Sequence, residues 1–110
     1  MSYQHKDLAA GRWSKLSFFE QMANIGSEVE RALNWQTKDN ISYSQKASER
    51  ALELIDLTLE NVKNPAHLKE ITRLREAVTD YFFGSNQFMS TKSSWRNYFS
   101  YFTYAARRNH

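Results

Sequence analysis

The chain has 110 residues, a formal net charge of +3 and 41% hydrophobic residues, which is typical of one globular domain with a single core. It contains no cysteine, so disulfides, thiolate metal sites and cysteine nucleophiles are excluded. The three glycines and one proline are too few for the frequent turns of an all-β fold, and they favour a small number of long helices.

The first stretch of the chain is polar and has no helical period. Residues 1–13 include Gly11 and end at Trp13, and they predict a flexible leader before a single domain over residues 14–110. No apolar run approaches the roughly 20 residues of a membrane span, and the first residues lack the apolar segment of a signal peptide. We therefore expect a cytoplasmic protein that does not enter a membrane.

A capping-box pattern marks the start of the first predicted helix, over residues 17–35. Ser17 and Glu20 have the spacing at which the serine oxygen accepts from the glutamate N–H and the carboxylate reaches back. Gly26 lies at the edge of the apolar face, where the close approach of a neighbouring backbone would account for a glycine. The apolar face consists of Phe18, Met22, Ile25, Val29, Ala32 and Leu33.

A second capping-box pattern, from Ser42 to Gln45, follows a polar stretch over residues 36–41 that has the composition of a loop. It predicts a helix over residues 42–62. The apolar face of this helix is broad, and a stripe of that width contacts two neighbouring helices. Its central positions are Ala47, Ala51, Leu54, Ile55 and Val62, with Leu52, Leu57 and Leu59 at the edges.

Asn64 and Pro65 indicate the start of a third helix, because asparagine is a good N-cap and proline fits the first helical position. The helix is predicted over residues 65–83, with Gly84 ending it. Its expected inward side chains are Leu68, Ile71, Leu74, Val78, Tyr81 and Phe82.

Ser93 or Ser94 can cap a fourth helix, predicted over residues 94–108 after a polar loop. Its core stripe comprises Trp95, Tyr98, Phe99, Phe102, Ala105 and Ala106. Four amphipathic helices with short connections predict an all-α fold, an antiparallel up-down four-helix bundle.

The last thirty residues combine aromatic rings with positive charge. They hold ten of the sixteen aromatic residues and no acidic residue. Core packing accounts for the stripe of the fourth helix, but Tyr101 and Tyr104 lie outside that stripe. Tyrosine and arginine are enriched at protein interfaces, and they also suit RNA, where rings stack on bases and guanidinium groups hold phosphates. The candidate partner surface is Arg96, Tyr101, Tyr104, Arg107 and Arg108.

Two charged residues border apolar faces. Arg75 lies at the rim of the third helix face, and Glu30 lies beside Phe19 at the border of the first. A charge in such a position is usually paired, since an unpaired buried charge is costly. We predict a partly buried polar contact at Arg75 and at Glu30, within the bundle or between subunits.

No constellation for catalysis or metal binding is found. The chain has no Glu-x-x-His pair, no G-x-S-x-G and no phosphate-binding glycine loop, and His67 is expected to play a structural part in the third helix. We therefore predict a protein that is not an enzyme and uses no cofactor and no metal.

Residues 20–29 and 68–76 resemble a prokaryotic family of small proteins to which no activity is attached. The whole architecture is similar to the bundle proteins encoded in 23S rRNA intervening sequences and to the accessory proteins of diversity-generating retroelements. That resemblance implies ring-like oligomers and, for the retroelement members, binding of RNA and a reverse transcriptase. It is one of shape, so no functional residue is carried over.

The sequence thus predicts a non-catalytic interaction bundle, a scaffold or adaptor that self-associates as a homo-oligomer or binds a protein partner. The alternative is an RNA- or DNA-binding protein. In that alternative Lys92, Arg96, Arg107 and Arg108 hold phosphates, and Tyr101 and Tyr104 stack on bases.

Overall fold

Helices cover most of residues 11–108, the part of the chain that the computed structural model describes. A short 3-10 helix, Trp13–Lys15, precedes four α-helices. These are α1 (Phe18–Thr37), α2 (Ile41–Asn61), α3 (Pro65–Phe83) and α4 (Lys92–Arg108). No strand occurs within that range. The predicted all-α fold, an antiparallel four-helix bundle, is confirmed.

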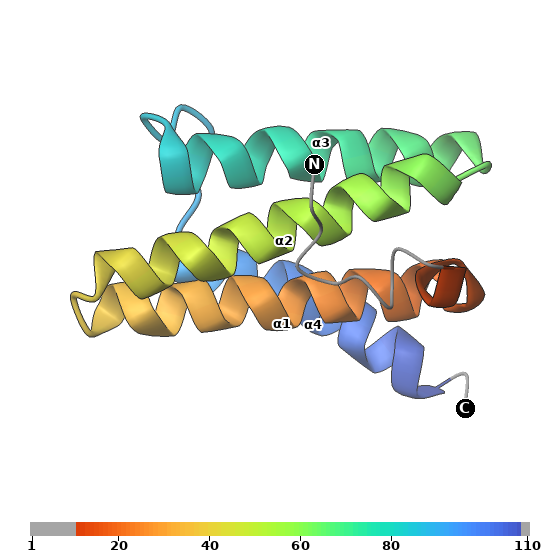
Figure 1. Cartoon of the computed structure of the whole chain (residues 1–110), viewed down its shortest axis with the longest axis horizontal. Helices are drawn as coiled ribbons and strands as arrows, with labels where there is room; N and C mark the ends of the chain where they lie inside the picture. Colours follow the sequence, from red (N-terminus) through yellow and green to blue (C-terminus); the bar gives the residue numbers. More distant parts are fainter. Residues whose placement is uncertain (1–10, 109–110) are drawn as a thin grey trace.

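The four helices are not packed as a symmetric square. α1 packs against both α2 and α4, whereas α3 packs mainly against α2. α4 starts near the end of α3, crosses behind α1 and slopes away from α2 and α3 towards its C-terminal end (Figure 1). α3 and α4 therefore meet through long side chains, such as the edge-to-face rings of Tyr81 and Trp95, rather than through close backbones.

Several helix ends lie where the side-chain chemistry predicts them. Ser17 Oγ accepts from Glu20 N at 3.1 Å, and Glu20 Oε1 accepts from Ser17 N at 2.9 Å, which completes the capping box of α1. Asn64 Oδ1 accepts from two backbone N–H groups at the start of α3, directly before Pro65. Gly84 forms the C-cap of α3.

The predicted starts of α2 and α4 are wrong by one and two residues. Asn40, not Ser42, caps α2, because its Oδ1 accepts from Tyr43 N at 3.0 Å. α1 also continues to Thr37, so only three residues join the two helices, and Asp39 turns the chain at φ 59°. At α4, Thr91 and Ser94 exchange side-chain and backbone hydrogen bonds at 2.8 and 3.0 Å, in place of a cap by Ser93 or Ser94.

Trp13 belongs to the core, which corrects the predicted leader. The indole is 1% exposed, and its Nε1 donates to Thr58 Oγ1 on α2 at 3.0 Å. Gln21 Nε2 on α1 donates to the Trp13 carbonyl at 2.9 Å. These partners fix the turn before α1 in place, so the domain begins before residue 14. The rest of the predicted leader, residues 1–10, lies outside the described residues.

One predicted core position is wrong. Leu68, expected to point inward, is 46% exposed; it lies in the first turn of α3, and α3 packs mainly against α2 alone. Tyr81 and Phe82 are half-buried, while Ile71, Leu74 and Val78 are buried as predicted. The broad face of α2 contacts α1 on one side and α3 on the other, which confirms its predicted role.

The connection between α3 and α4 is an ordered loop. The Asp80 carboxylate accepts from Gln87 N at 2.7 Å and from Phe88 N at 3.0 Å. Asn86, at φ 57°, pairs its side-chain amide with the backbone of Ser90. These bonds set where α4 starts relative to α3. No helix in residues 11–108 combines the length and hydrophobicity that a membrane crossing requires.

A matched pair of substitutions tests the contribution of Trp13. Trp95 is also buried, but its Nε1 has no hydrogen-bond partner within the described residues. Trp13→Phe and Trp95→Phe remove similar ring area, yet only the first removes a hydrogen bond and leaves the Thr58 oxygen short of a donor. We expect Trp13→Phe to lower the free energy of unfolding by about 1–2 kcal/mol more than Trp95→Phe. Urea unfolding of both variants measures this, and equal losses would contradict the assignment.

Candidate interaction groove

The placement of α4 depends on a close contact at Gly26. A Cβ built on Gly26 would lie 2.7 Å from Phe99 Cδ1 and 2.9 Å from Phe99 Cβ, so only glycine fits here. A neighbour does approach closely at Gly26, as predicted, but it is the base of an aromatic side chain on α4 and not a backbone. This contact sets how near the two helices can come.

An open groove runs between α1 and α4 beside this contact. Its volume is about 410 Å³. Four apolar side chains, Val29 and Leu33 from α1 and Trp95 and Phe99 from α4, form its floor. We call this feature the α1/α4 groove. Its floor is apolar and its rim is polar, which is the usual anatomy of a site that binds a side chain or a helix of a partner.

An ion pair closes one edge of the α1/α4 groove. Arg96 Nε donates to both Glu30 carboxylate oxygens at 2.9 and 3.1 Å, and Arg96 Nη2 reaches Asn34 Oδ1 at 3.4 Å. The hydrogen bond to Glu30 raises the pKa of Arg96. Both side chains are nearly half exposed, so solvent screens the pair and it contributes little to stability. Its effect is to hold the guanidinium at the rim.

Both predicted polar contacts occur within the bundle, and they lie at its surface with side chains about half exposed. Glu30 pairs with Arg96 at an exposed rim, because it lies at the edge of α1 that faces α4. Arg75 Nε donates to Asp56 Oδ1 of α2 at 2.8 Å, and these side chains are 46% and 39% exposed. The hydrogen bond to Asp56 raises the pKa of Arg75. Arg75 therefore joins α2 and α3 from outside the core.

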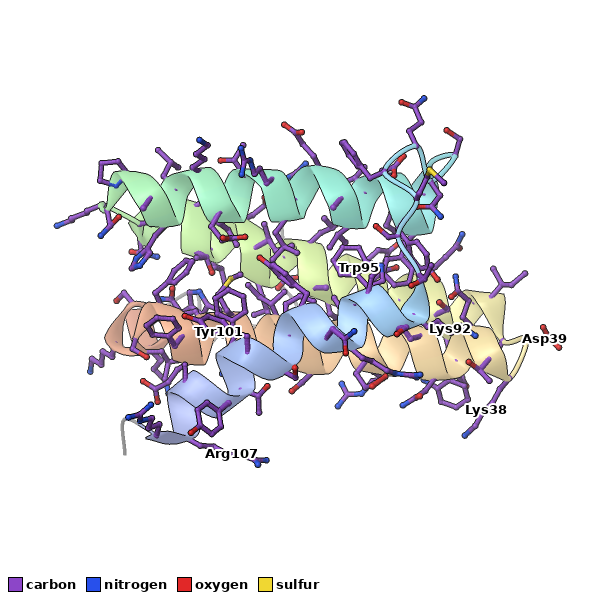
Figure 2. All side chains as sticks on the ribbon, turned by 180° about the vertical axis from the view of Figure 1, so that it is seen from behind. Lys38, Asp39, Lys92, Trp95, Tyr101 and Arg107 are labelled. Atoms are coloured by element: carbon purple, nitrogen blue, oxygen red, sulfur yellow. The ribbon has the colours of Figure 1, made fainter. Side chains whose placement is uncertain are left out.

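The predicted partner surface on α4 divides into two sides. Arg96, Tyr104 and Arg107 all line the α1/α4 groove. Tyr101 instead packs edge-to-face on Phe19 at 6.3 Å, and Figure 2 shows it on the other side of α4 from Arg107. Tyr101 and Tyr104 are 61% and 65% exposed, so core packing does not require either hydroxyl-bearing ring. Arg108 is exposed and does not line the groove.

A second, smaller cavity of about 250 Å³ separates α3 from α4. Tyr98 Oη donates to Glu70 Oε2 across this seam at 2.6 Å. Burial and then the contact with Glu70 raise the pKa of Tyr98. Burial alone raises the pKa of the nearby Tyr81. Trp95 lines this cavity as well as the α1/α4 groove.

Glu28 is the most buried carboxylate among the described residues, and the sequence did not predict its role. Glu28 has a side chain that is only 12% exposed, and it accepts from Arg31 Nη1 at 2.9 Å and Arg50 Nε at 3.3 Å. A signal was present, since Glu28 lies three residues after Ile25 and four before Ala32 on the core face of α1. The second arginine comes from α2, and no local pattern identifies it.

The Gly26 contact gives a testable prediction. In an open helix Gly26→Ala would stabilise the protein by about 1 kcal/mol through helix propensity. Here the new Cβ overlaps the root of the Phe99 side chain, so we expect a loss of about 2 kcal/mol. Ser27→Ala, at the neighbouring exposed position, should stay within about 0.5 kcal/mol of wild type. Thermal unfolding compares them, and a stabilised Gly26→Ala variant would refute the contact.

The raised pKa of Tyr98 predicts a loss of stability in alkali. Tyrosines of the unfolded chain ionise near pH 10, whereas folded Tyr98 keeps its proton to a higher pH. Above about pH 10 the unfolded state therefore binds fewer protons, and the free energy of unfolding falls as pH rises. Tyr98→Phe should flatten this fall, while Tyr104→Phe, the same change on the exposed face, should follow wild type. Urea titrations from pH 8 to 11 measure how steeply the free energy of unfolding falls with pH in each protein. Identical slopes for wild type and both variants would contradict the raised pKa of Tyr98.

Comparison with known proteins finds no matching family model, curated protein or solved structure. Within residues 11–108, no group of three or more His, Cys, Asp or Glu side chains is arranged to hold a metal ion. The function is therefore argued from the α1/α4 groove and its charges.

Proposed function

We propose that this protein is a non-catalytic interaction module that binds an acidic, amphipathic helix of a partner protein in the α1/α4 groove. The observation that carries the proposal is the combination of an open apolar floor with a basic rim. Helix-in-groove recognition uses such a floor for anchors at i, i+3, i+4 and i+7.

The length of the groove suits a helix. The α4 residues that line it run from Trp95 to Arg107. Twelve helical steps of about 1.5 Å span roughly 18 Å, which matches about three turns of a partner helix. Ser100 and Thr103 lie between these ends. Their hydroxyl groups donate to the carbonyls of Asn97 and Phe99, so each hydroxyl oxygen can accept a hydrogen bond from the polar edge of such a helix.

The charge of the rim selects an acidic partner. Three charged side chains line the groove, Glu30, Arg96 and Arg107, which gives it a net charge of +1. α4 as a whole has four basic residues and no carboxylate. Arg107 makes no ion pair with any residue that the structure describes, and Arg96 is held in position by Glu30. A partner carboxylate near Arg107 would gain a favourable pair, and a lysine there would be repelled.

The same charges make α4 a poor surface for contact with a second copy of itself. An antiparallel α4–α4 contact would bring two helices together that each carry +4 and have no acidic residue. Like charges across an interface are costly, so we place self-association after a distinct acidic partner. The predicted homo-oligomer remains a prediction.

Two synthetic helices test this function. Both carry leucine at i, i+3, i+4 and i+7, and their polar positions hold glutamate in one and lysine in the other. We expect the glutamate helix alone to bind and to shift the amide NMR signals of Val29, Ser100 and Thr103. Arg107→Glu should weaken binding about tenfold, whereas Arg108→Glu, the same charge change outside the groove, should weaken it less than about threefold.

Three results would overturn the proposal. One is equal binding of the two helices, and another is absence of binding by the glutamate helix. The third is a stable oligomer in light scattering that Tyr101→Glu with Tyr104→Glu dissociates, because the occupant of this face would then be a second copy of the chain.

A further inference from the structure

Cations and aromatic rings also gather where α1 meets α2. Two rows of side chains face each other there, since the helices are antiparallel and joined by only three residues. Within each row the side chains are three or four residues apart, so they lie on one face of their helix. We call this feature the hairpin edge, and it consists of Arg31, Trp35 and Lys38 with Tyr43, Lys46 and Arg50.

The two rings of the hairpin edge touch each other, and an ammonium group lies near each. The centroids of Trp35 and Tyr43 are 4.8 Å apart, with an interplanar angle of 75°. Lys38 Nζ lies 5.2 Å from the Trp35 ring centre, and Lys46 Nζ lies 5.6 Å from that of Tyr43. A hollow of about 260 Å³ lies among Trp35, Tyr43, Lys46 and Arg50. Rings and cations thus share one small surface.

Within the hairpin edge, four basic side chains stand against one carboxylate that pairs with them, Glu28, and the next acidic residues of α2 are Glu49 and Glu53. The buried Glu28 carboxylate is shared by Arg31 and Arg50, so one guanidinium charge exceeds it. Lys38 and Lys46 form no ion pair within residues 11–108. The nearby Asp39 lies at the tip of the turn, and Figure 2 shows it pointing in a different direction from Lys38. An anionic ligand would therefore meet positive charge at this edge.

We propose that the hairpin edge binds single-stranded nucleic acid. Sequence-tolerant binding of single strands combines aromatic platforms for bases with cations for the backbone, and this edge supplies both from adjacent helices. Tyr43 and Trp35 stack on bases, while Lys38, Lys46 and the two arginines contact phosphates. A duplex does not fit this chemistry, because its bases are already stacked.

The lysines do not block this use of the rings. An exposed cation–π contact is weak compared with the stacking of a base on an aromatic side chain. Each lysine can leave its ring face for a phosphate while a base takes its place. The proposal rests on contacts of α1 with α2 only, so it is independent of the α1/α4 groove and of the acidic helix proposed to bind there.

Fluorescence anisotropy with a labelled single-stranded RNA of mixed sequence tests the proposal, at about 50 mM salt. Tyr43→Ala should lower the affinity about tenfold, and Tyr43→Phe should keep it, because the ring is retained. Lys46→Glu should lower the affinity at least about fivefold, whereas Lys63→Glu, the same charge change in the α2–α3 connection, should have a smaller effect. With about four phosphate contacts, the logarithm of the affinity should fall with the logarithm of salt at a slope near −3.

Several outcomes would overturn this assignment. Absence of binding at low salt would refute it directly. If Lys46→Glu and Lys63→Glu lowered the affinity for RNA equally, the RNA would be attracted by the net charge of the protein alone. If the double variant Arg107→Glu with Arg108→Glu lost affinity for the RNA while Lys46→Glu kept it, the nucleic acid would bind on α4 instead. Far-UV circular dichroism and melting temperature confirm that each variant is folded, and Tyr43→Phe separates loss of the ring from loss of structure.

Discussion

The Phe99 ring packs directly on the backbone of α1 at Gly26, and the position of α4 depends on this contact. With no Cβ at Gly26, α4 approaches closely enough for Arg96 to reach Glu30, one turn further along α1. The same approach directs Tyr98 across the seam to Glu70 of α3. The α1/α4 groove, its ion pair and the α3–α4 cavity all follow from where this one ring is seated.

α1 is the central element of the bundle, with α4 on one side and α2 on the other. The two seams present different chemistry to solvent. The α1/α4 groove has an apolar floor and a few charges at its rim, which suits a folded amphipathic segment. The hairpin edge has exposed rings and excess positive charge around a carboxylate that is already satisfied, which suits an anionic chain with flat bases. The two surfaces share no side chain.

Buried hydrogen bonds position the helices where apolar packing alone would allow sliding. Trp13 bonds to Thr58, and the Thr58 hydroxyl in turn donates to the Leu54 carbonyl at 2.9 Å. Ser44 Oγ donates to the carbonyl of Ala32 at 2.9 Å, which joins α2 to α1. Such directional contacts specify one register between two apolar faces, because a buried polar group without its partner is costly.

The sequence by itself determined the four helices, the cap of α1 at Ser17, the start of α3 at Asn64 and the presence of a close neighbour at Gly26. These features depend on side-chain periods and on hydrogen bonds within a few residues, so the linear order contains the information. Only the tertiary structure decided that Trp13 is core, that Glu30 pairs with Arg96 and Arg75 with Asp56, and that Tyr101 lies apart from Tyr104 and Arg107. It also brought Trp35 beside Tyr43 and Arg50 beside Glu28. Each of these outcomes depends on a neighbouring element. Which side chains meet is set by how far the helices approach and at what angle they cross, which no local pattern encodes.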